Sequence, residues 1–178
     1  MRYVALLRGI NVGGNNKIAM SELKLVFTQL GCGDVSTYIN TGNVIFSDTR
    51  GKDVLTNLIT EAIKTHFRLA VPIVLRTAAD ISHLIDHAPN DWTNDTLQKT
   101  DVMFLWDTID DDSILQKIVT NPTVENVIYL PGALIWNIAR ENATKGNGIL
   151  LVKSEHYRSM TVRNINTVRK LNLLLEGT

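Results

Sequence analysis

The chain has 178 residues, of which 44% are hydrophobic and 20% charged, and its 18 lysines and arginines balance 18 acidic residues. This composition is ordinary for a globular protein with one domain or two small ones. Apolar runs fall short of the roughly 18 residues that a membrane-spanning helix needs, and there is no signal-peptide pattern, so we expect no membrane association. The single cysteine, Cys32, excludes an internal disulfide, so we expect a reducing, cytoplasmic location.

The charges are distributed unevenly along the chain. Residues 1–77 have nine Lys/Arg against five acids, residues 78–139 have two against ten, and residues 140–178 have seven against three. Basic ends around an acidic middle can steer an anionic ligand, although solvated faces that happen to segregate would give the same pattern. A surface that binds duplex nucleic acid is usually far more basic overall, which argues against a nucleic-acid partner.

The first part of the chain predicts one supersecondary unit. Residues 2–8 are typical of a buried strand, and apolar residues at helical spacing follow up to Gly31. Two further strands joined by Thr41-Gly42 form a hairpin, and a helix with one broad apolar stripe leads to a last strand. The order β-α-β-β-α-β is that of a ferredoxin-like unit. The predicted elements after the first strand are a helix at 20–30, strands at 35–40 and 43–47, a helix at 54–67 and a strand at 72–76.

The same order recurs in the second half. Thr77 and Asp80 resemble a capping box that opens a connecting helix, and a polar stretch follows it. The acid run 110–112 is typical of a helix N-terminal cap, and Asn166 can cap a closing helix. The remaining predicted elements are strands at 102–106, 126–130, 134–138 and 160–163 and helices at about 114–119 and 148–157.

Two spacings indicate that one unit occurs twice. The hairpin glycines Gly42 and Gly132 lie 90 residues apart, and Arg76 and Arg163, each at the end of a last strand, lie 87 apart. A chance repetition of a common motif is the alternative. We therefore predict an α+β fold of two tandem ferredoxin-like βαββαβ units, packed into one compact body with a closing C-terminal helix. The units would be 1–77 and 101–178, with 78–100 as a connecting helix and loop.

The loop after the first strand is a candidate anion site. It joins a strand to a helix, and such junctions present backbone N–H groups and a partial positive charge. It lacks the Lys-Ser/Thr of a P-loop, and it is not the dinucleotide G-x-G-x-x-G pattern. A purely structural role, with glycines turning the chain and asparagines bonding their own backbone, is the alternative. The candidate contacts are Arg8, Asn11, Gly13, Gly14, Asn15, Asn16 and Lys17.

The junction between the last strand and the closing helix is the second candidate. Arg163 could hold a phosphate or carboxylate with two parallel hydrogen bonds, with Asn164 and Asn166 beside it. Alternatively, Arg163 pairs with an acid of the middle segment and Asn166 is only a helix cap. The hairpin residues Asn40 and Asn43 are expected at the opposite edge from Arg8, so they are not assigned to the same site.

Three separated segments resemble a known family. The opening YVALLRGINVGGNNKIAMSEL, the hairpin segment YINTGNVIF and the closing MTVRNINTVRKL are similar to those of the family catalogued as domain of unknown function 1697. The resemblance implies an α+β fold with two ferredoxin-like parts and implies no activity. The chain departs from the family's closing motif at Ile165, where tryptophan is usual, which argues against an aromatic ring acting there.

Familiar catalytic and metal patterns are absent. His83 and His87 lie one helical turn apart, but no glutamate stands between them as in H-E-x-x-H, so we expect no metal. No general base is evident in the motifs, and we assign no catalytic residue and no cofactor. The leading hypothesis is a module that binds a small phosphate- or carboxylate-bearing ligand. The alternatives are an enzyme acting on a nucleotide or other phosphorylated substrate, and a structural or regulatory module that binds a protein partner. The oligomeric state is left open.

Overall fold

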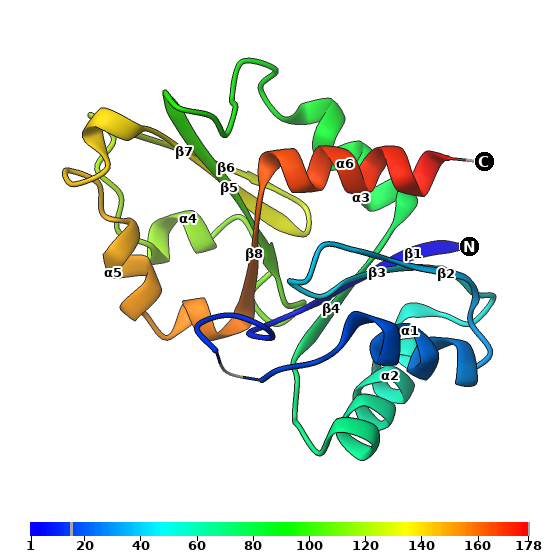
Figure 1. The fold of residues 1–178 in the computed structure, drawn as a ribbon. Coiled ribbons are helices and arrows are strands. Elements are labelled where there is room, and N and C mark those ends of the chain that lie inside the picture. Colours follow the sequence, from blue (N-terminus) through cyan, green and yellow to red (C-terminus); the bar gives the residue numbers. More distant parts are fainter. Residues whose placement is uncertain (15, 178) are drawn as a thin grey trace. The chain divides into compact units, whose positions relative to one another are not determined.

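The computed structural model describes residues 1–14 and 16–177, and in this part of the chain it has an α+β fold with two four-stranded antiparallel sheets and six α-helices (Figure 1). The chain divides into two units, Met1–Ile81 with Leu171–Thr178, and Ser82–Lys170. Helix α3 (Ala78–His87) and helix α6 (Ile165–Glu176) therefore have residues in both units. The prediction that residues 78–100 form a separate connecting segment stays a prediction.

The first unit has the expected order of elements. Its sheet has the strand order β2-β3-β1-β4, which is compatible with a ferredoxin-like unit. All neighbouring strands in this sheet are antiparallel. The elements are β1 (Arg2–Leu7), α1 (Met20–Gln29), β2 (Gly33–Tyr38), β3 (Asn43–Ser47), α2 (Lys52–Phe67) and β4 (Ile73–Thr77).

Helices α1 and α2 cover one face of this sheet and form the first core (Figure 1). Alternate residues of β1 point into it, because successive side chains of a strand face opposite sides. The ring of Tyr3 stacks on Phe46 with centroids 5.6 Å apart, and Phe27 of α1 meets the same ring edge-on at 5.2 Å. Helices α1 and α2, with their continuous apolar stripes, therefore bury this face of the sheet.

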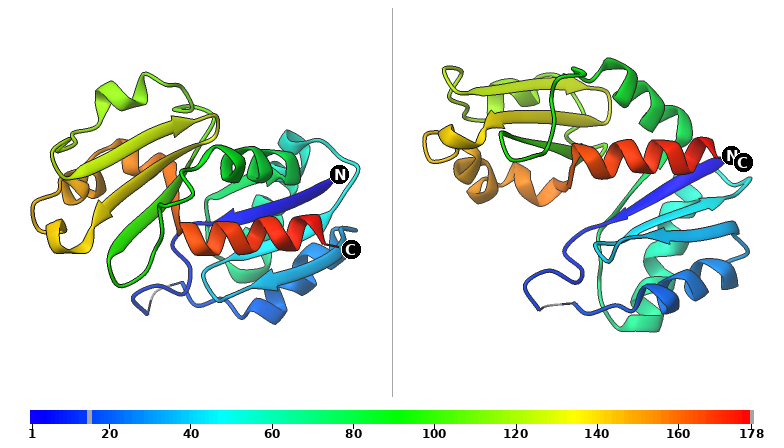
Figure 2. Two further views of the ribbon diagram at one scale, coloured as in Figure 1. Left: turned by 90° about the horizontal axis from the view of Figure 1, so that it is seen from above. Right: turned by 45° about the horizontal axis from the view of Figure 1, so that its top comes forward.

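The other face of β1 is buried as well. Val4 and Leu6 are fully buried on that side. The Arg2 guanidinium donates to the carbonyl oxygens of Leu174 at 3.1 Å and Gly177 at 2.7 Å, which satisfies carbonyls at the end of α6 (Ile165–Glu176). Figure 2 shows this end of α6 (red) beside the start of β1 (dark blue).

The second unit has the same strand order in its own sheet, β6-β7-β5-β8. The capping box that opens α3 is confirmed: Thr77 N–H donates to Asp80 Oδ2 at 2.8 Å and Asp80 N–H to Thr77 Oγ1 at 3.1 Å. The elements of this half are α3 (Ala78–His87), β5 (Gln98–Leu105), α4 (Ile114–Lys117), β6 (Glu125–Leu130), β7 (Ala133–Ala139), α5 (Gly148–Lys153) and β8 (Met160–Asn164). Two 3₁₀ turns, η1 (Arg140–Asn142) and η2 (His156–Ser159), flank α5.

The helices that cover the second sheet are short. Helix α4 has four residues and α5 has six, whereas α1 and α2 have 10 and 16. Each short helix places one fully buried side chain, Ile114 and Leu151, in a core with Met103, Leu105 and other residues. Because so few turns lie over the sheet, they cannot cover this face as α1 and α2 cover the first.

Two expected helix caps are wrong. Asn166 lies inside α6, and the cap is Asn164, whose Oδ1 accepts from the N–H of Thr167 at 2.8 Å. In the acid run, Asp110 Oδ1 instead accepts from Tyr129 O–H at 2.9 Å and Gly132 N–H at 2.8 Å, which ties it to the β6–β7 hairpin. Asx-type bonding explains the first shift, because Asn164 stands three residues before the N–H group from which it accepts. In the acid run the local bond is made by Asp111, whose Oδ1 accepts from Ser113 N–H at 3.0 Å, while Asp110 bonds to the hairpin 19 to 22 residues further on.

Candidate functional site

The loop between β1 and α1 contains most of the residues predicted for the anion site. Its backbone has positive φ at Gly9, Asn11, Gly13, Gly14 and Asn16, with values from 48° to 80°. Repeated left-handed residues turn successive N–H groups toward one side, which is how backbone anion nests are built. The glycines at 13 and 14 are exposed, as is Lys17. Asn15 lies outside the described residues.

The side chains of Asn11 and Asn16 in this loop bond to the protein itself. Asn11 Oδ1 accepts from Ile18 N–H at 2.9 Å, while its Nδ2 donates to the carbonyls of Ile18 at 2.9 Å and Asn40 at 2.8 Å. Asn16 Nδ2 donates to Gly9 O at 3.0 Å. These side chains therefore hold the shape of the loop, as the structural alternative expected, and any anion here would be bound mainly by backbone groups and cations.

The hairpin tip lies next to this loop, and the prediction that placed it at the opposite edge is wrong. Leu7 N–H donates to Gly42 O at 2.8 Å. A β-carbon on Gly42, whose φ is 82°, would lie 2.7 Å from Leu7 Cβ, so only glycine fits. The physical reason is the antiparallel pairing of β3 with β1, which brings the start of β3 to the end of β1.

The second predicted junction lies in the other unit. Arg163 is 7% exposed, and its Nη1 donates to Thr161 Oγ1 at 3.2 Å and to Val162 O at 2.8 Å. Burial lowers the pKa of its guanidinium to about 10. Asn166 Nδ2 donates to the carbonyl of Asn94 at 2.8 Å. Arg8 belongs to the first unit, so the prediction that Arg8 and Arg163 grip one ligand stays a prediction.

No group of three or more metal-ligating side chains occurs within residues 1–14 and 16–177. The rings of His83 and His87 are 4.1 Å apart, with His87 Nδ1 at 2.8 Å from the carbonyl of His83. Cys32 is buried beside Asp48, and burial is the larger of the causes that raise its thiol pKa to about 11. A thiol with such a pKa is a poor nucleophile at neutral pH.

The second unit contains a hollow of about 590 Å³ over its sheet. Its floor is formed by side chains of neighbouring strands, and its wall by the segment that includes α5. This volume lies in the range of small-molecule sites, about 300–1,000 Å³. The floor consists of Lys99, Asp101, Met103, Glu125, Trp136, Ile138 and Val162, and the wall includes Ala143, Thr144, Gly146, Gly148, Ile149, Val152 and Tyr157.

The strand register sets the chemistry of the floor. On β5, Asp101 lies directly opposite Trp136 of β7, and Lys99 directly opposite Ile138. Paired residues of antiparallel strands share a face, so the charged residues of β5 border the apolar centre that β7 supplies. Lys99 Nζ and Asp101 Oδ2 form an ion pair at 3.1 Å. The hollow is therefore apolar in its middle and has one ion pair at its side.

Glu125 at the start of β6 fixes the wall. Its buried carboxylate accepts three backbone N–H groups: Asn121 at 2.7 Å on Oε2, and Asn147 at 2.7 Å and Gly148 at 3.2 Å on Oε1. A β-carbon on Gly146 would lie 2.5 Å from Oε1, so the chain before α5 passes as close to the carboxylate as glycine allows. The carboxylate is a structural anchor of α5.

Sequence reasoning missed the hollow. The available signal was the alternation of Lys99 and Asp101 with the buried Thr100 and Val102, in a strand that is apolar only from Val102 on. In the first unit, Tyr3 lies four residues before the end of β1 and directly opposite Phe46. In the second unit, Asp101 lies four residues before the end of β5 and directly opposite Trp136. A charge thus stands where the first unit has a core aromatic ring.

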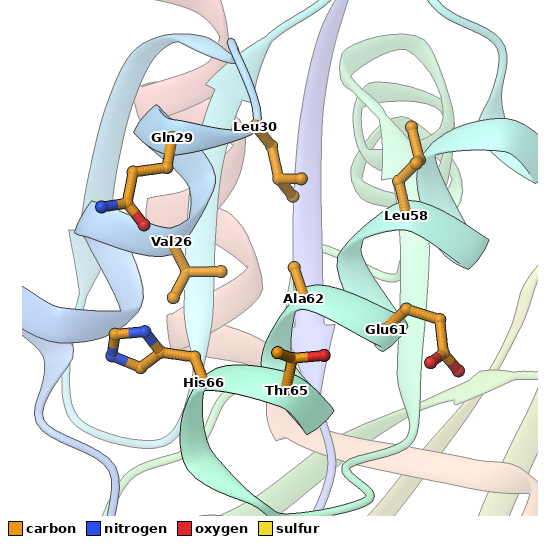
Figure 3. A pocket seen from close by; sticks show the side chains of 8 residues that line it. All are labelled: Val26, Gln29, Leu30, Leu58, Glu61, Ala62, Thr65 and His66. Atoms are coloured by element: carbon orange, nitrogen blue, oxygen red, sulfur yellow. The ribbon is translucent and has the colours of Figure 1, made fainter.

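The first unit has a shallower groove of about 390 Å³ on the outer side of α1 and α2 (Figure 3). Val26 of α1 and Leu30, just after that helix, face Leu58 and Ala62 of α2 across it, with His66 at one end. His66 Nε2 lies 3.2 Å from Glu22 Oε2. The second-unit hollow is larger, at about 590 Å³, and has the Lys99–Asp101 ion pair among its lining residues, so we take it as the candidate site.

The fold and the site define the class as an α+β protein with two four-stranded antiparallel sheets and a hollow over the second. The chain belongs to the family of proteins of unknown function designated DUF1697, whose model matches residues 1–136. It is similar to the conserved bacterial protein SP0830 from Streptococcus pneumoniae, with 29% identity, a TM-score of 0.85 and coverage of 98% of each chain. No curated protein matches the chain. Among the described residues, no helix has the length and apolarity to cross a membrane.

Proposed function

We propose that this protein binds a small organic molecule with an apolar body in the hollow of the second unit. This keeps the class of function expected from the sequence, small-ligand binding, and assigns it to a different place. The observation that carries the proposal is the hollow itself, with Trp136 and Ile138 in its floor and polar groups at its side. Pockets of this size with mostly apolar lining and few polar groups are the usual form of small-molecule sites.

The proposed site exists because the second unit has the same strand order as the first but shorter helices over its sheet. We propose that the two units are tandem ferredoxin-like repeats. Their strand orders correspond, and Leu105 N–H donates to Gly132 O at 3.0 Å just as Leu7 does to Gly42. In the second repeat the helices over the sheet are short, so part of the sheet face is left for a ligand instead of a helix.

The exposed apolar residues of α5 support the same proposal. Ile149 and Val152 line the hollow and are 63% and 54% exposed. Apolar side chains that remain this exposed beside an apolar floor gain free energy when a ligand covers them, at roughly 25 cal/mol per Å² of apolar area. The ligand would thus be held between the strands and α5.

The test uses the uncharged fluorescent probe N-phenyl-1-naphthylamine with the whole protein. We expect saturable binding and a raised melting temperature, since a ligand that binds only the folded state stabilises it. Val152→Asp should weaken binding by about tenfold or more, because it places a charge against the apolar body of the probe. Val54→Asp, at an equally exposed (54%) helical valine on α2, is the matched control. Absence of binding, or equal binding by both variants, would contradict the proposal.

A second candidate is an anion at the loop between β1 and α1, as the sequence suggested. The run of left-handed residues around Gly13 and Gly14 supports it, with Lys17 and Arg8 as nearby cations in the chain. Titration with inorganic phosphate, followed through the amide signals of Gly13 and Gly14, tests it. Lys17→Met should weaken the response and the exposed Lys24→Met should not. Unchanged amide signals would exclude this candidate.

A further inference from the structure

We infer that the hollow selects a ligand that carries a positive and a negative group side by side next to a large apolar group, as in a free amino acid with an apolar side chain. This inference rests on the proposed function, because it concerns the ligand of the same site. It is carried by the place of one ion pair in the hollow and by what surrounds that pair.

The pair is formed by Lys99 and Asp101, two residues apart on β5 and on one face of the sheet. The Nζ–Oδ2 distance is 3.1 Å, and the side chains are 52% and 22% exposed. Both residues line the hollow. A partly exposed pair of this kind contributes little to stability, so it can exchange its internal contact for contacts with a ligand at small cost.

The third charged residue that lines the hollow, Glu125, already bonds to backbone groups of the protein. The Glu125 carboxylate accepts from the N–H groups of Asn121, Asn147 and Gly148, with both oxygens in use. A ligand cation would have to compete with three backbone donors in a buried setting. Among the charged residues that line the hollow, this leaves Lys99 and Asp101 to meet the ligand.

The apolar part of the ligand has a defined neighbour. Asp101 is directly opposite Trp136 and Lys99 directly opposite Ile138, so the apolar floor begins one strand away from both charges. Adjacent strands are about 4.8 Å apart, so a ligand whose ionic groups meet the pair places its next few carbon atoms over Trp136 and Ile138. The spacing suits a side chain attached directly to the carbon that bears both ionic groups.

Electrostatics favours both charges on the ligand over one. A carboxylate alone gains Lys99 but faces Asp101 within the same few ångströms, and an amine alone has the reverse difficulty. A ligand with both groups satisfies each partner without leaving an unpaired charge. Like-charge contacts of this kind are how sites reject near analogues.

The corresponding position of the first unit indicates that the pair is not needed for folding. There the strand has Tyr3 in place of Asp101, stacked on Phe46 in the core. A charge at a position that a core aromatic could occupy is a local departure from the folding pattern, and such departures are typical of functional sites.

The test compares three probes that share one benzyl group. L-Phenylalanine has both charges, 3-phenylpropionate has only the carboxylate, and 2-phenylethylamine has only the ammonium group. By calorimetry and by displacement of N-phenyl-1-naphthylamine, we expect L-phenylalanine to bind at least about tenfold more tightly than either analogue, since each analogue lacks the charge-assisted bond to one member of the pair.

The variants Lys99→Met and Asp101→Asn should each remove most of that preference while the uncharged probe still binds. The double variant Glu61→Gln/Lys64→Met, which removes an exposed ion pair on α2, is the matched control and should bind as the unaltered protein does. Melting temperatures confirm that each variant is folded. Equal binding of the three probes, or a preference that survives both variants, overturns the inference and leaves the proposed function intact. Failure of the uncharged probe itself overturns the proposed function.

Discussion

Replacing Glu125 by glutamine tests how the second unit holds α5. The carboxylate is 4% exposed and accepts two backbone N–H groups on Oε1 and one on Oε2. Glutamine is nearly isosteric, but it has one acceptor oxygen and one NH₂ group. With its oxygen placed at Oε1 it keeps the bonds from Asn147 and Gly148, and its NH₂ group then points at the N–H of Asn121.

The magnitude follows from these three bonds. The bond from Asn121 is lost outright, which costs about 2 kcal/mol for a charged acceptor. The two others become neutral, which weakens each by about 1 kcal/mol. We therefore expect the free energy of unfolding to fall by about 4 kcal/mol, a large part of the 5–15 kcal/mol typical of a domain. The corresponding fall in melting temperature is about 10 °C.

Urea titration followed by circular dichroism measures the loss. Glu155→Gln, at an exposed position of the same unit, is the control and should change stability by less than about 0.5 kcal/mol. Because α5 carries Ile149 and Val152, the Glu125 variant should also bind N-phenyl-1-naphthylamine more weakly. A loss of less than about 1 kcal/mol would refute the view that the carboxylate carries these three bonds.

Three further outcomes are expected. Gly42→Ala should lower the free energy of unfolding, measured in urea, by about 2 kcal/mol or more, because Gly42 has a positive φ and an added β-carbon would clash with β1. Gly51→Ala is the control and should not lower it, since no atom lies within 4 Å of the added β-carbon. Cys32, with its thiol pKa raised to about 11, should react with 5,5′-dithiobis(2-nitrobenzoate) at pH 8 only as fast as the first unit opens; a rapid reaction in the folded protein would contradict this. The Arg50 guanidinium lowers the pKa of Asp48, so the pair stabilises the fold above pH about 4, and that contribution is lost as the pH falls. Asp48→Asn should therefore flatten the acidic part of the plot of unfolding free energy against pH. An unchanged plot would contradict this.

The strands were predictable because their patterns are local. Val102 to Leu105 and Val44 to Phe46 are short runs of apolar residues, and both lie in buried parts of strands of the structure. The reciprocal bonds of Thr77 and Asp80 also depend on residues three apart, so the sequence was sufficient to find them.

The alternation of Lys99 and Asp101 indicates an unusual strand, but the hollow itself could not be predicted from it, because the hollow depends on how little of the sheet the short helices cover. The apolar residues of α5 resemble those of any amphipathic segment, and nothing in the sequence shows that only Leu151 among them is buried. The role of Glu125 likewise depends on the chain returning to it more than 20 residues later, at Asn147 and Gly148. Local patterns contain no information about such distant contacts.

For the loop between β1 and α1, the sequence pattern is local but fits two different roles. Asn11 and Asn16 stand in a glycine-rich turn, where asparagine is equally suited to a ligand and to its own backbone. Only the distances, such as 2.8 Å from Asn11 Nδ2 to Asn40 O, show that the side chains serve the loop. The position of Asn40 follows from antiparallel strand pairing and could have been worked out from the predicted order of strands.

The first unit is discontinuous, since it contains residues 1–81 together with the last turns of α6, which Arg2 holds through the carbonyls of Leu174 and Gly177. During translation, Arg2 of the opening strand must therefore wait for these bonds until the ribosome has made Gly177. The second unit is a continuous stretch and emerges complete before then. Removing these turns of α6 should thus harm a segment that is synthesised long before them.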